Sequence, residues 1–334
     1  MRALLVQSAN DWVIADAPKP VAHEDEVVIS VVASGICGTD LHTLSGSNTA
    51  VIFPIIPGHE FGGIVVSIGS GATTFAVGDR VVVNPSRTCE NCKFCISEKS
   101  NLCRTKGGYG TKYPGGFSNF VAIQEKSCVL VPSSMSWKTA LLAEPLACVL
   151  TGMVKLTDVK GKRVLVIGGG PIGSLFAYVL MKFTSDVTVI EPVKERRNLI
   201  SRLGIRSVLD PKDLLANDKW DIVIDATGSA AVMQDSVKFV ENGGIFLIMG
   251  VAQPDDQILI SPQMLNRWEI SIMGSFSINN TFAEAVQLLS TTDDDLEILV
   301  TDIYKLESFE EALQAMKRKS AMKILVTCSE EIIL

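Results

Sequence analysis

The sequence has 334 residues, a length that suggests about two domains and excludes peptide hormones and single small modules. The 30 Lys and Arg residues against 37 Asp and Glu residues give a formal net charge of −7. No long basic run offsets this charge, so we expect no nucleic acid partner. Hydrophobic residues make up 47% of the chain, which is typical of a globular protein.

The beginning of the chain, MRALLVQSANDWVIADAPKP, lacks the continuous apolar core of a signal peptide. The most apolar stretches of the whole chain, such as VLVIGGG and IGSLFAYVLM, are interrupted by Gly and Pro and are shorter than the roughly 20 residues that cross a membrane. Eight cysteines in a chain of this length are too few for a disulfide scaffold. We therefore expect a cytoplasmic protein without a membrane partner.

Two patterns of secondary structure follow one another along the chain. Up to about residue 150, short β-type runs separated by turn residues (RALLVQ, EVVISVVAS, GGIVVSIG, RVVVNP and FVAIQ) predict an irregular β domain. Over residues 151–285, strand-type and helix-type segments alternate, as in KRVLVIGGG, PIGSLFAYVLMKF, DVTVIEP and KERRNLISRLG. This alternation predicts a doubly wound parallel sheet of the α/β class. We expect residues 286–334 to return to the first domain and complete it.

Four cysteines lie close together in the polar stretch TCENCKFCISEKSNLC, with the spacing C-x2-C-x2-C-x7-C: Cys89, Cys92, Cys95 and Cys103. Four thiolates close a tetrahedral zinc site with no open coordination position, so such a metal would hold a loop rather than perform chemistry. An iron–sulfur cluster is the alternative. The spacing argues against it, because the bacterial ferredoxin run has three residues before its last Cys and a Pro after it.

A glycine-rich motif follows the strand RVLVI and precedes an apolar helix. Its expected cofactor-binding residues are Gly168, Gly170, Pro171, Ile172 and Gly173. Glycines at this spacing allow a tight turn, the approach of a pyrophosphate and close packing of helix and strand, which predicts a dinucleotide site.

Glu191 ends the next predicted strand, where a carboxylate accepts hydrogen bonds from the adenosine ribose. A 2′-phosphate would be repelled there, so NAD is favoured over NADP. Arg196 and Arg197 could reach such a phosphate, but we expect them on a solvated helix face.

A second set of possible metal ligands is dispersed along the chain: Cys37 in GICGTDLH, His59 and Glu60 in PGHEFGG, and Glu144 in AEPLA. A catalytic zinc takes three protein ligands and leaves one position open, and Cys, His and carboxylates are suitable donors. Each residue alone has an ordinary structural explanation, as a small buried thiol, a turn histidine or a surface carboxylate.

These strings, together with the four-cysteine loop and VLVIGGGPIG, occur in an order that resembles the zinc-dependent medium-chain alcohol and polyol dehydrogenases. The likeness is to the sorbitol and threonine dehydrogenase branch and covers nearly the whole chain. It implies a GroES-like catalytic domain, a Rossmann domain that binds NAD, and two zinc ions per chain, one catalytic and one structural. It also implies a homodimer or homotetramer, and the strand EISIMGSF is a candidate for the contact between subunits.

The resemblance implies a role for each residue of the dispersed set. Cys37, His59 and Glu144 would bind the catalytic zinc, with Glu60 alternating with water, and Cys148 stays open as an alternative to Glu144. Two further residues, Thr39 and His42, would begin and end the path of the alcohol proton, which also passes the nicotinamide ribose.

The expected activity is transfer of a hydride between a secondary alcohol group of a polyol, sugar acid or related hydroxylated molecule and NAD. Many relatives have a substrate-binding arginine at the position of Ser277, so sorbitol itself is in doubt. Ser277, Asn279 and Asn280 could hydrogen-bond a hydroxylated substrate or lie in a surface turn between strand and helix. The alternative to an enzyme is a non-catalytic protein that binds zinc and a dinucleotide and has a structural or regulatory role.

Overall fold

The computed structural model describes residues 1–156, 158–215, 217–292 and 295–329. The chain divides into two compact units: the first comprises Met1–Ala147 and Ile278–Leu334, and the second comprises Cys148–Ser277. Both boundaries fall a few residues before those predicted from the sequence, so that the whole of helix α9 (Phe282–Leu289) belongs to the first unit.

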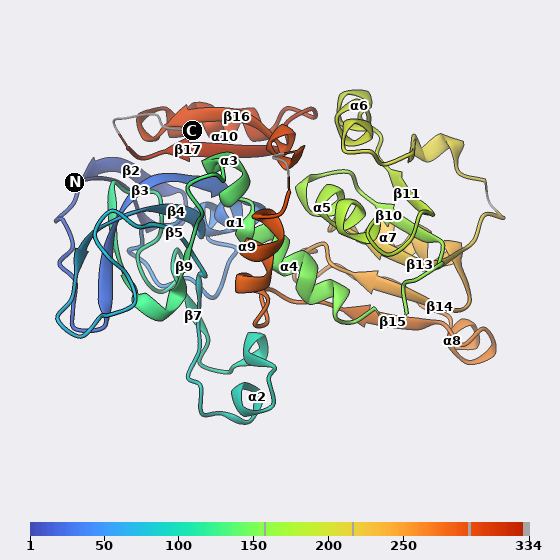
Figure 1. The fold of residues 1–334 in the computed structure, drawn as a ribbon. Helices are drawn as coiled ribbons and strands as arrows, with labels where there is room; N and C mark the ends of the chain where they lie inside the picture. Colours follow the sequence, from blue (N-terminus) through green and yellow to red (C-terminus); the bar gives the residue numbers. More distant parts are fainter. Residues whose placement is uncertain (157, 216, 293–294, 330–334) are drawn as a thin grey trace. The chain divides into compact units, whose positions relative to one another are not determined.

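The first unit is built around a seven-stranded sheet (Figure 1). Its strand order is β16 (Val300–Lys305), β17 (Lys323–Thr327), β3 (Glu26–Ile36), β4 (Glu60–Ile68), β5 (Arg80–Val83) and β9 (Cys128–Leu130), and β8 (Phe120–Gln124) also pairs with β3. These strands include runs of Val and Ile with turn residues between them, as the sequence predicted. β17 pairs antiparallel with β3, so the last part of the chain adds to a sheet that the first part begins.

Smaller elements surround this sheet. Strands β1 (Arg2–Ser8) and β2 (Asp11–Asp16) form a hairpin, and β6 (Ser86–Arg87) pairs with β7 (Gly107–Gly108). The α-helices that lie wholly within this unit are α1 (Gly38–Ser45), α2 (Lys93–Ile96), α3 (Trp137–Ala140), α9 and α10 (Phe309–Met316). Short 3-10 turns occupy Ser100–Leu102, Glu125–Ser127, Asp295–Leu299 and Leu306–Ser308.

The core of the first unit joins its two sequence-distant parts. Phe309, the first residue of α10, is fully buried. Its ring lies 5.0 Å from that of Phe117 and 5.7 Å from that of Trp12, both in edge-to-face geometry. Figure 1 shows α10 and β17 (red) beside the β1–β2 hairpin (blue). Burial of aromatic surface therefore holds the C-terminal segment on the N-terminal domain.

The second unit is a six-stranded parallel sheet in the order β12 (Ser207–Leu209), β11 (Val187–Ile190), β10 (Val164–Ile167), β13 (Trp220–Asp225), β14 (Val240–Ile248) and β15 (Ser271–Gly274). Numbered along the chain, this order is 3-2-1-4-5-6, in which the winding reverses between β10 and β13. Ligands of doubly wound sheets bind at such a reversal, outside the carboxyl ends of the strands.

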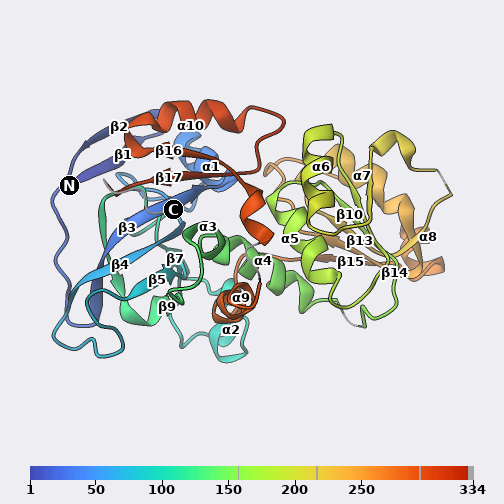
Figure 2. The same cartoon turned by 45° about the horizontal axis from the view of Figure 1, so that its top comes forward.

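Helices connect the strands of this sheet: α5 (Pro171–Leu180), α6 (Lys194–Arg202), α7 (Ala230–Ser236) and α8 (Pro262–Arg267), with 3-10 turns at Pro211–Asp213 and Val237–Phe239. α4 (Ala143–Met153) crosses the boundary between the units. Figure 2 shows α5 and α6 beside the strands that they connect. In the described part of the chain, every helix is too short or too polar to cross a membrane.

Candidate active site

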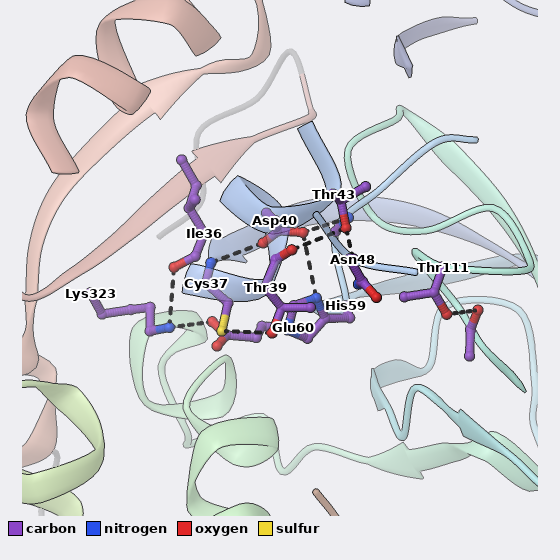
Figure 3. A network of polar contacts seen from close by, with 12 residues as sticks. Ile36, Cys37, Thr39, Asp40, Thr43, Asn48, His59, Glu60, Thr111 and Lys323 are labelled. Carbon is purple, nitrogen blue, oxygen red and sulfur yellow. Dashed lines mark hydrogen bonds and ion pairs between the residues drawn. The ribbon is translucent and has the colours of Figure 1, made fainter. Parts of the chain in front are cut away.

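Three of the predicted metal ligands meet where β3 ends and β4 begins (Figure 3). β3 and β4 are antiparallel neighbours, and their register places Gly35 opposite Glu60. Cys37 follows β3 directly, and His59 directly precedes Glu60. The ligand atoms of Cys37, His59 and Glu60 all lie within 4.8 Å of one another. A thiolate, an imidazole and a carboxylate at this separation fit a zinc ion.

A buried carboxylate that the sequence analysis did not select, Asp40, lies behind these ligands. It is 1% exposed. Its Oδ2 accepts a hydrogen bond from the backbone N–H of Cys37 at 2.9 Å, and its Oδ1 lies 3.5 Å from His59 Nδ1. Oδ1 also accepts from Gly58 N at 3.3 Å. Asp40 therefore orients the His59 ring with Nε2 directed away from the Asp40 carboxylate. A histidine that binds a metal through one ring nitrogen commonly has its other ring nitrogen hydrogen-bonded to a carboxylate in this way.

The charge state of His59 reflects the same neighbours. Burial favours the neutral ring and lowers its pKa. The charge and hydrogen bond of Asp40, assisted by Cys37, outweigh burial and raise the pKa of His59 well above its ordinary value. The pocket is therefore electrostatically suited to a cation, and a metal ion would take the place of that proton.

Lys323 is the second residue that the sequence analysis missed. It begins β17, is 4% exposed, and donates hydrogen bonds to Glu60 Oε2 at 2.5 Å and to the carbonyl of Ile36 at 3.3 Å. Burial lowers the pKa of Lys323, but the charge of Glu60, with smaller contributions from Cys37 and Glu144, raises it overall. A Cβ on Gly35 would lie 2.2 Å from Glu60 Oε2, so only glycine leaves room for this pair.

Glu144 lies near this cluster without belonging to it. It is in the first turn of α4, and its charge acts on Lys323. Glu60, Phe282 and Glu144 surround one tightly packed space. The group of ligand atoms within 4.8 Å of one another does not include that of Glu144. Cys148, the alternative ligand, lies four residues further along α4, in the second unit.

The two residues expected to move a proton lie on α1. Thr39 and His42 are three residues apart and therefore on one face of the helix. Thr39 Oγ1 lies 3.8 Å from Cys37 Sγ, next to the ligand cluster. His42 is half-buried, and its Nδ1 lies 2.9 Å from the hydroxyl of the exposed Ser47. The helix thus places a hydroxyl beside the ligands and an imidazole toward solvent.

The four cysteines of the polar loop lie together in the first unit. The sulfur atoms are 3.6 Å apart for Cys92 and Cys95, 3.9 Å for Cys89 and Cys95, and 3.5 Å for Cys89 and Cys103. Sulfur ligands at 2.3 Å around a tetrahedral zinc are about 3.8 Å from one another, whereas a disulfide requires about 2.0 Å. The backbone at Cys89 lowers the pKa of the Cys103 thiol to about 6, which favours a thiolate there. The site fits structural zinc.

Ser277, Asn279 and Asn280 have different surroundings from those expected of substrate ligands. The amide side chains of Asn279 and Asn280 are hydrogen-bonded to the four-cysteine loop. Ser277 ends the second unit in a left-handed conformation, with φ of 55°. The turn interpretation of the two asparagines is therefore the better one.

The glycine motif forms the turn from β10 into α5 in the second unit. Gly168 has φ of 98°, and a Cβ there would lie 2.8 Å from Thr227. Gly173 is packed more tightly still, because a Cβ would lie 1.8 Å from the carbonyl oxygen of Gly168. A Cβ on Gly170 would have no heavy atom within 4 Å. Two glycines thus serve packing, while the middle one, followed by Pro171 and Ile172, leaves open space at the helix N-terminus for a pyrophosphate.

Glu191 lies at the carboxyl end of β11 and is 2% exposed. Its two carboxylate oxygens accept hydrogen bonds from Gly169 N at 3.0 Å and Val193 N at 2.8 Å. A carboxylate has about four acceptor positions, so these two bonds leave capacity for ribose hydroxyls. Glu191 therefore fixes the glycine turn as well as facing the expected adenosine position.

The expectation that Arg196 and Arg197 lie on a solvated helix face is wrong. Arg197 donates to the carbonyls of Glu191 and Pro192, at 2.7 Å and 2.8 Å, and pairs with Asp210 at 3.2 Å. The guanidinium of Arg196 lies 3.8 Å from the Glu191 carboxylate. α6 begins directly after β11, so its first turn directs these long side chains back toward the strand end.

A further buried carboxylate, Asp225, lies at the carboxyl end of β13. It is fully buried and accepts hydrogen bonds from the backbone of Thr227 at 3.2 Å and Gly228 at 3.3 Å. Its own carbonyl accepts from Gly250 N at 3.0 Å. Because Thr227 contacts the glycine turn, Asp225 supports the edge of the sheet at which the winding reverses. The sequence string DATG contains it, but no spacing rule identified it.

Replacing Lys323 tests the buried ion pair. We expect Lys323→Met to destabilise the protein by about 3–5 kcal/mol, because Glu60 would be left as an unpaired buried charge. Adding Glu60→Gln should recover much of this loss, since the second change removes the orphaned charge. Urea unfolding measures both, with the exposed Lys319→Met as control. Equal stability of Lys323→Met and the unmodified protein would contradict the assignment.

Comparison with protein families gives two matches that together cover most of the chain. Residues 23–133 match the alcohol dehydrogenase GroES-like domain, and residues 138–327 match the glucose dehydrogenase C-terminus. The first match contains the Cys37, His59 and Glu60 cluster and the four-cysteine loop. The second contains Glu144 and the glycine turn.

Individual relatives agree with these matches. A D-altritol 5-dehydrogenase of Agrobacterium fabrum is 34% identical over 90% of this chain and 91% of its own, and a D-arabinitol dehydrogenase of Uromyces fabae is 32% identical over 98% and 97%. A solved zinc-binding dehydrogenase of Sinorhizobium meliloti bound to NADP has a TM-score of 0.92 at 27% identity, covering 98% of both chains. An Escherichia coli alcohol dehydrogenase complexed with NADH has a TM-score of 0.88 at 26% identity, covering 98% and 99%.

These findings support a catalytic protein rather than the non-catalytic alternative, with zinc and a nicotinamide cofactor. The GroES-like and Rossmann folds predicted from the sequence are confirmed. The chain is an oxidoreductase that acts on CH–OH groups, and it belongs to the zinc-dependent medium-chain alcohol and polyol dehydrogenases.

Proposed function

We propose that this protein transfers a hydride between a secondary alcohol group of a polyol, sugar acid or related hydroxylated small molecule and NAD. The observation that carries the proposal is the cluster of Cys37, His59 and Glu60, with the Thr39 hydroxyl beside it. The names of the relatives, which include D-altritol and D-arabinitol dehydrogenases, support a polyol substrate.

Cys37 and His59 would hold the catalytic zinc, with Glu144 as third ligand and Glu60 as the alternating one. When bound, zinc supplies a Lewis acid that stabilises negative charge on an oxygen, and the nicotinamide supplies the hydride acceptor. Glu144 is not in the group of ligand atoms within 4.8 Å of one another, so binding through Glu144 would bring its carboxylate closer to the other ligands. The neighbouring positive charge of Lys323 limits the repulsion between Glu60 and Glu144 as they share this space.

The remaining residues of the site hold and move the proton. Thr39 Oγ1 would accept a hydrogen bond from the substrate hydroxyl, and His42 would release the proton to solvent, a task suited to an imidazole. Ser47 fixes the His42 ring through Nδ1 and leaves Nε2 available for exchange. Asp40 keeps His59 oriented, and Lys323 holds the Glu60 carboxylate through a hydrogen bond to Oε2.

The second zinc would be bound by Cys89, Cys92, Cys95 and Cys103, so each chain would hold two ions. The close free thiols of this loop also favour a reducing compartment, and we propose that the protein acts in the cytoplasm.

NAD is the preferred cofactor in this proposal. The buried Glu191 carboxylate would repel a 2′-phosphate, and Arg197 is committed to backbone carbonyls and Asp210. Arg196 remains close to Glu191 and softens this repulsion. The solved relatives bind NADP in one case and NADH in the other, so the preference is a property to be measured on this chain.

We further propose a homodimer or homotetramer in which β15 forms a subunit contact. β15 is at the end of its sheet, and large apolar side chains around it are exposed: Leu259, Leu265, Trp268 and Phe276. An uncovered edge strand with apolar neighbours invites pairing with another chain. A two-fold axis beside β15 would pair this edge with its own copy.

Cys37→Ser and Thr39→Val test the proposed activity. With zinc-loaded protein, NAD and a panel of polyols, aldonates, sugar phosphates and L-threonine, we expect reduction of NAD by the unmodified protein. Cys37→Ser should abolish turnover. Thr39→Val should lower kcat by about 10²–10⁴-fold, the contribution typical of a proton-transfer group. Both variants should still bind NADH, and turnover unaffected by Cys37→Ser would exclude the proposed metal chemistry.

Glu191→Gln tests cofactor choice. The unmodified protein should bind NADH more tightly than NADPH in a fluorescence titration. The variant loses the charge but keeps an amide of similar shape, and we expect it to shift the ratio of the two Kd values toward NADPH by about tenfold, equivalent to 1.4 kcal/mol. Glu195→Gln, an exposed change on α6, should leave the ratio unchanged. A ratio insensitive to Glu191→Gln would remove this residue from cofactor selection.

Trp268→Asp tests the subunit contact. A charge in an apolar interface should convert the oligomer to a smaller species in sedimentation velocity experiments. Phe183→Asp is the matched control, because Phe183 is similarly exposed but lies after α5 rather than beside β15. If Trp268→Asp leaves the mass unchanged, the contact lies elsewhere.

A further inference from the structure

The four-cysteine loop is fastened to the segment that leads into α9. Asn279 Nδ2 donates to the carbonyl of Glu98 at 2.9 Å, and Asn279 Oδ1 accepts from the hydroxyl of Ser100 at 3.3 Å and from the backbone of Asn101 at 3.5 Å. The Ser100 hydroxyl also lies 3.0 Å from Asn280 Oδ1. Nearly 180 residues of the chain separate the loop from the segment that it contacts. Figure 1 shows the chain before α9 descending toward the loop that carries α2.

The same segment is fastened at its other end to α4. The hydroxyl of Thr281 donates to the carbonyl of Ala147 at 2.6 Å, and Thr281 is 5% exposed. The next residue, Phe282, is buried and lies with Ala143 and Glu144 around one tightly packed space. Ala147 lies three residues after Glu144 on this helix, so both contacts are made within one turn of the candidate zinc ligand.

The segment between the two attachments is short and conformationally restricted. Asn280 has φ of 60°, in the left-handed region that few residues other than Gly and Asn adopt readily. Asn279 is held by Glu98 and Asn101, the single hydroxyl proton of Ser100 is shared between the amide oxygens of Asn279 and Asn280, and Thr281 is held by Ala147. These contacts leave little freedom in between. A displacement at one end therefore reaches the other end without being absorbed by a flexible linker.

The four-cysteine loop has almost no apolar side chain to hold it in place. The stretch from Cys89 to Cys103 includes no buried hydrophobic side chain other than that of Cys103. A loop of this kind gains its fixed structure from metal binding, because it has no apolar core of its own. With zinc bound, Glu98, Ser100 and Asn101 would form a rigid platform for Asn279.

We propose that residues 279–282 form a strut through which the four-cysteine zinc loop positions α4 and, with it, Glu144. In this role Asn279 is a positioning residue, and the structural zinc contributes to the geometry of the catalytic zinc site in the same unit. The part of the inference that concerns Glu144 as a ligand rests on the proposed function. The coupling of the loop to α4 is independent of the proposed function.

Hydrogen–deuterium exchange on the zinc-loaded, full-length protein measures this coupling. We expect Asn279→Ala to accelerate amide exchange about fivefold both in the loop around residues 98–102 and at the start of α4 around residues 143–147, the effect of losing about one net hydrogen bond. Thr281→Val keeps the side-chain shape and should accelerate exchange in α4 alone. Ser97→Ala, which removes an exposed hydroxyl bonded only within the loop, is the matched control and should not affect α4.

Two additional measurements separate positioning from general stability. Co2+ placed in the catalytic site should show a changed ligand-field absorption in Asn279→Ala and Thr281→Val but not in Ser97→Ala. Asn279→Asp keeps an acceptor for Ser100 and Asn101 but places a carboxylate oxygen against the Glu98 carbonyl, so it should accelerate exchange in the same two segments as Asn279→Ala. If Asn279→Ala fails to fold, Thr281→Val and Asn279→Asp carry the same test.

Unchanged exchange in α4 when Asn279→Ala loosens the loop would overturn the strut. Unchanged exchange in α4 in Thr281→Val would overturn it as well. Altered exchange together with an unaltered Co2+ spectrum would overturn the effect on the metal site. None of these results depends on turnover, so they are distinguishable from failure of the proposed activity, which would appear as a lack of NAD reduction in the unmodified protein.

Discussion

Burial of opposite charges at the end of β3 is the constraint on which the candidate active site depends. Glu60 and Lys323 come from different parts of the chain and meet in a space that a side chain on Gly35 would fill. Neither charge is tolerable there without the other. The pairing of β17 with β3 and of β3 with β4 is thus required for the electrostatics of the site as well as for the sheet.

Much of the fold and part of the site could be predicted from local sequence. The alternation of strand and helix segments predicted the parallel sheet, and close spacing predicted the four-cysteine site, because a short loop brings its own ligands together. The Gly168 turn was predictable for the same reason, since its requirements are met within six residues. Cys37 and His59 were interpretable only jointly, because each has an ordinary structural alternative.

The rest depends on contacts that leave no local signal. Lys323 occurs in KILVTC, which reads as a strand like any other, and its partner Glu60 is 263 residues away. Asn279 acts on a backbone group of the four-cysteine loop that the tertiary fold brings to it, so no residue spacing marks this contact. The prediction that Arg196 and Arg197 are solvated was wrong because a helical pattern shows which residues share a face of the helix. It does not show the angle between the helix and the preceding strand.

The bond between Thr281 and Ala147 has a consequence for how the molecule is assembled. It joins Ala147, the last residue before the chain leaves the first unit, to Thr281, three residues after the chain returns at Ile278, so the second unit is an insertion whose two ends are close together in space. Insertions with adjacent ends can be accepted by a host domain without disturbing its core. The first unit therefore has the topology of a self-contained zinc domain into which a dinucleotide-binding domain has been placed, and a short loop from residue 147 to residue 278 would close it.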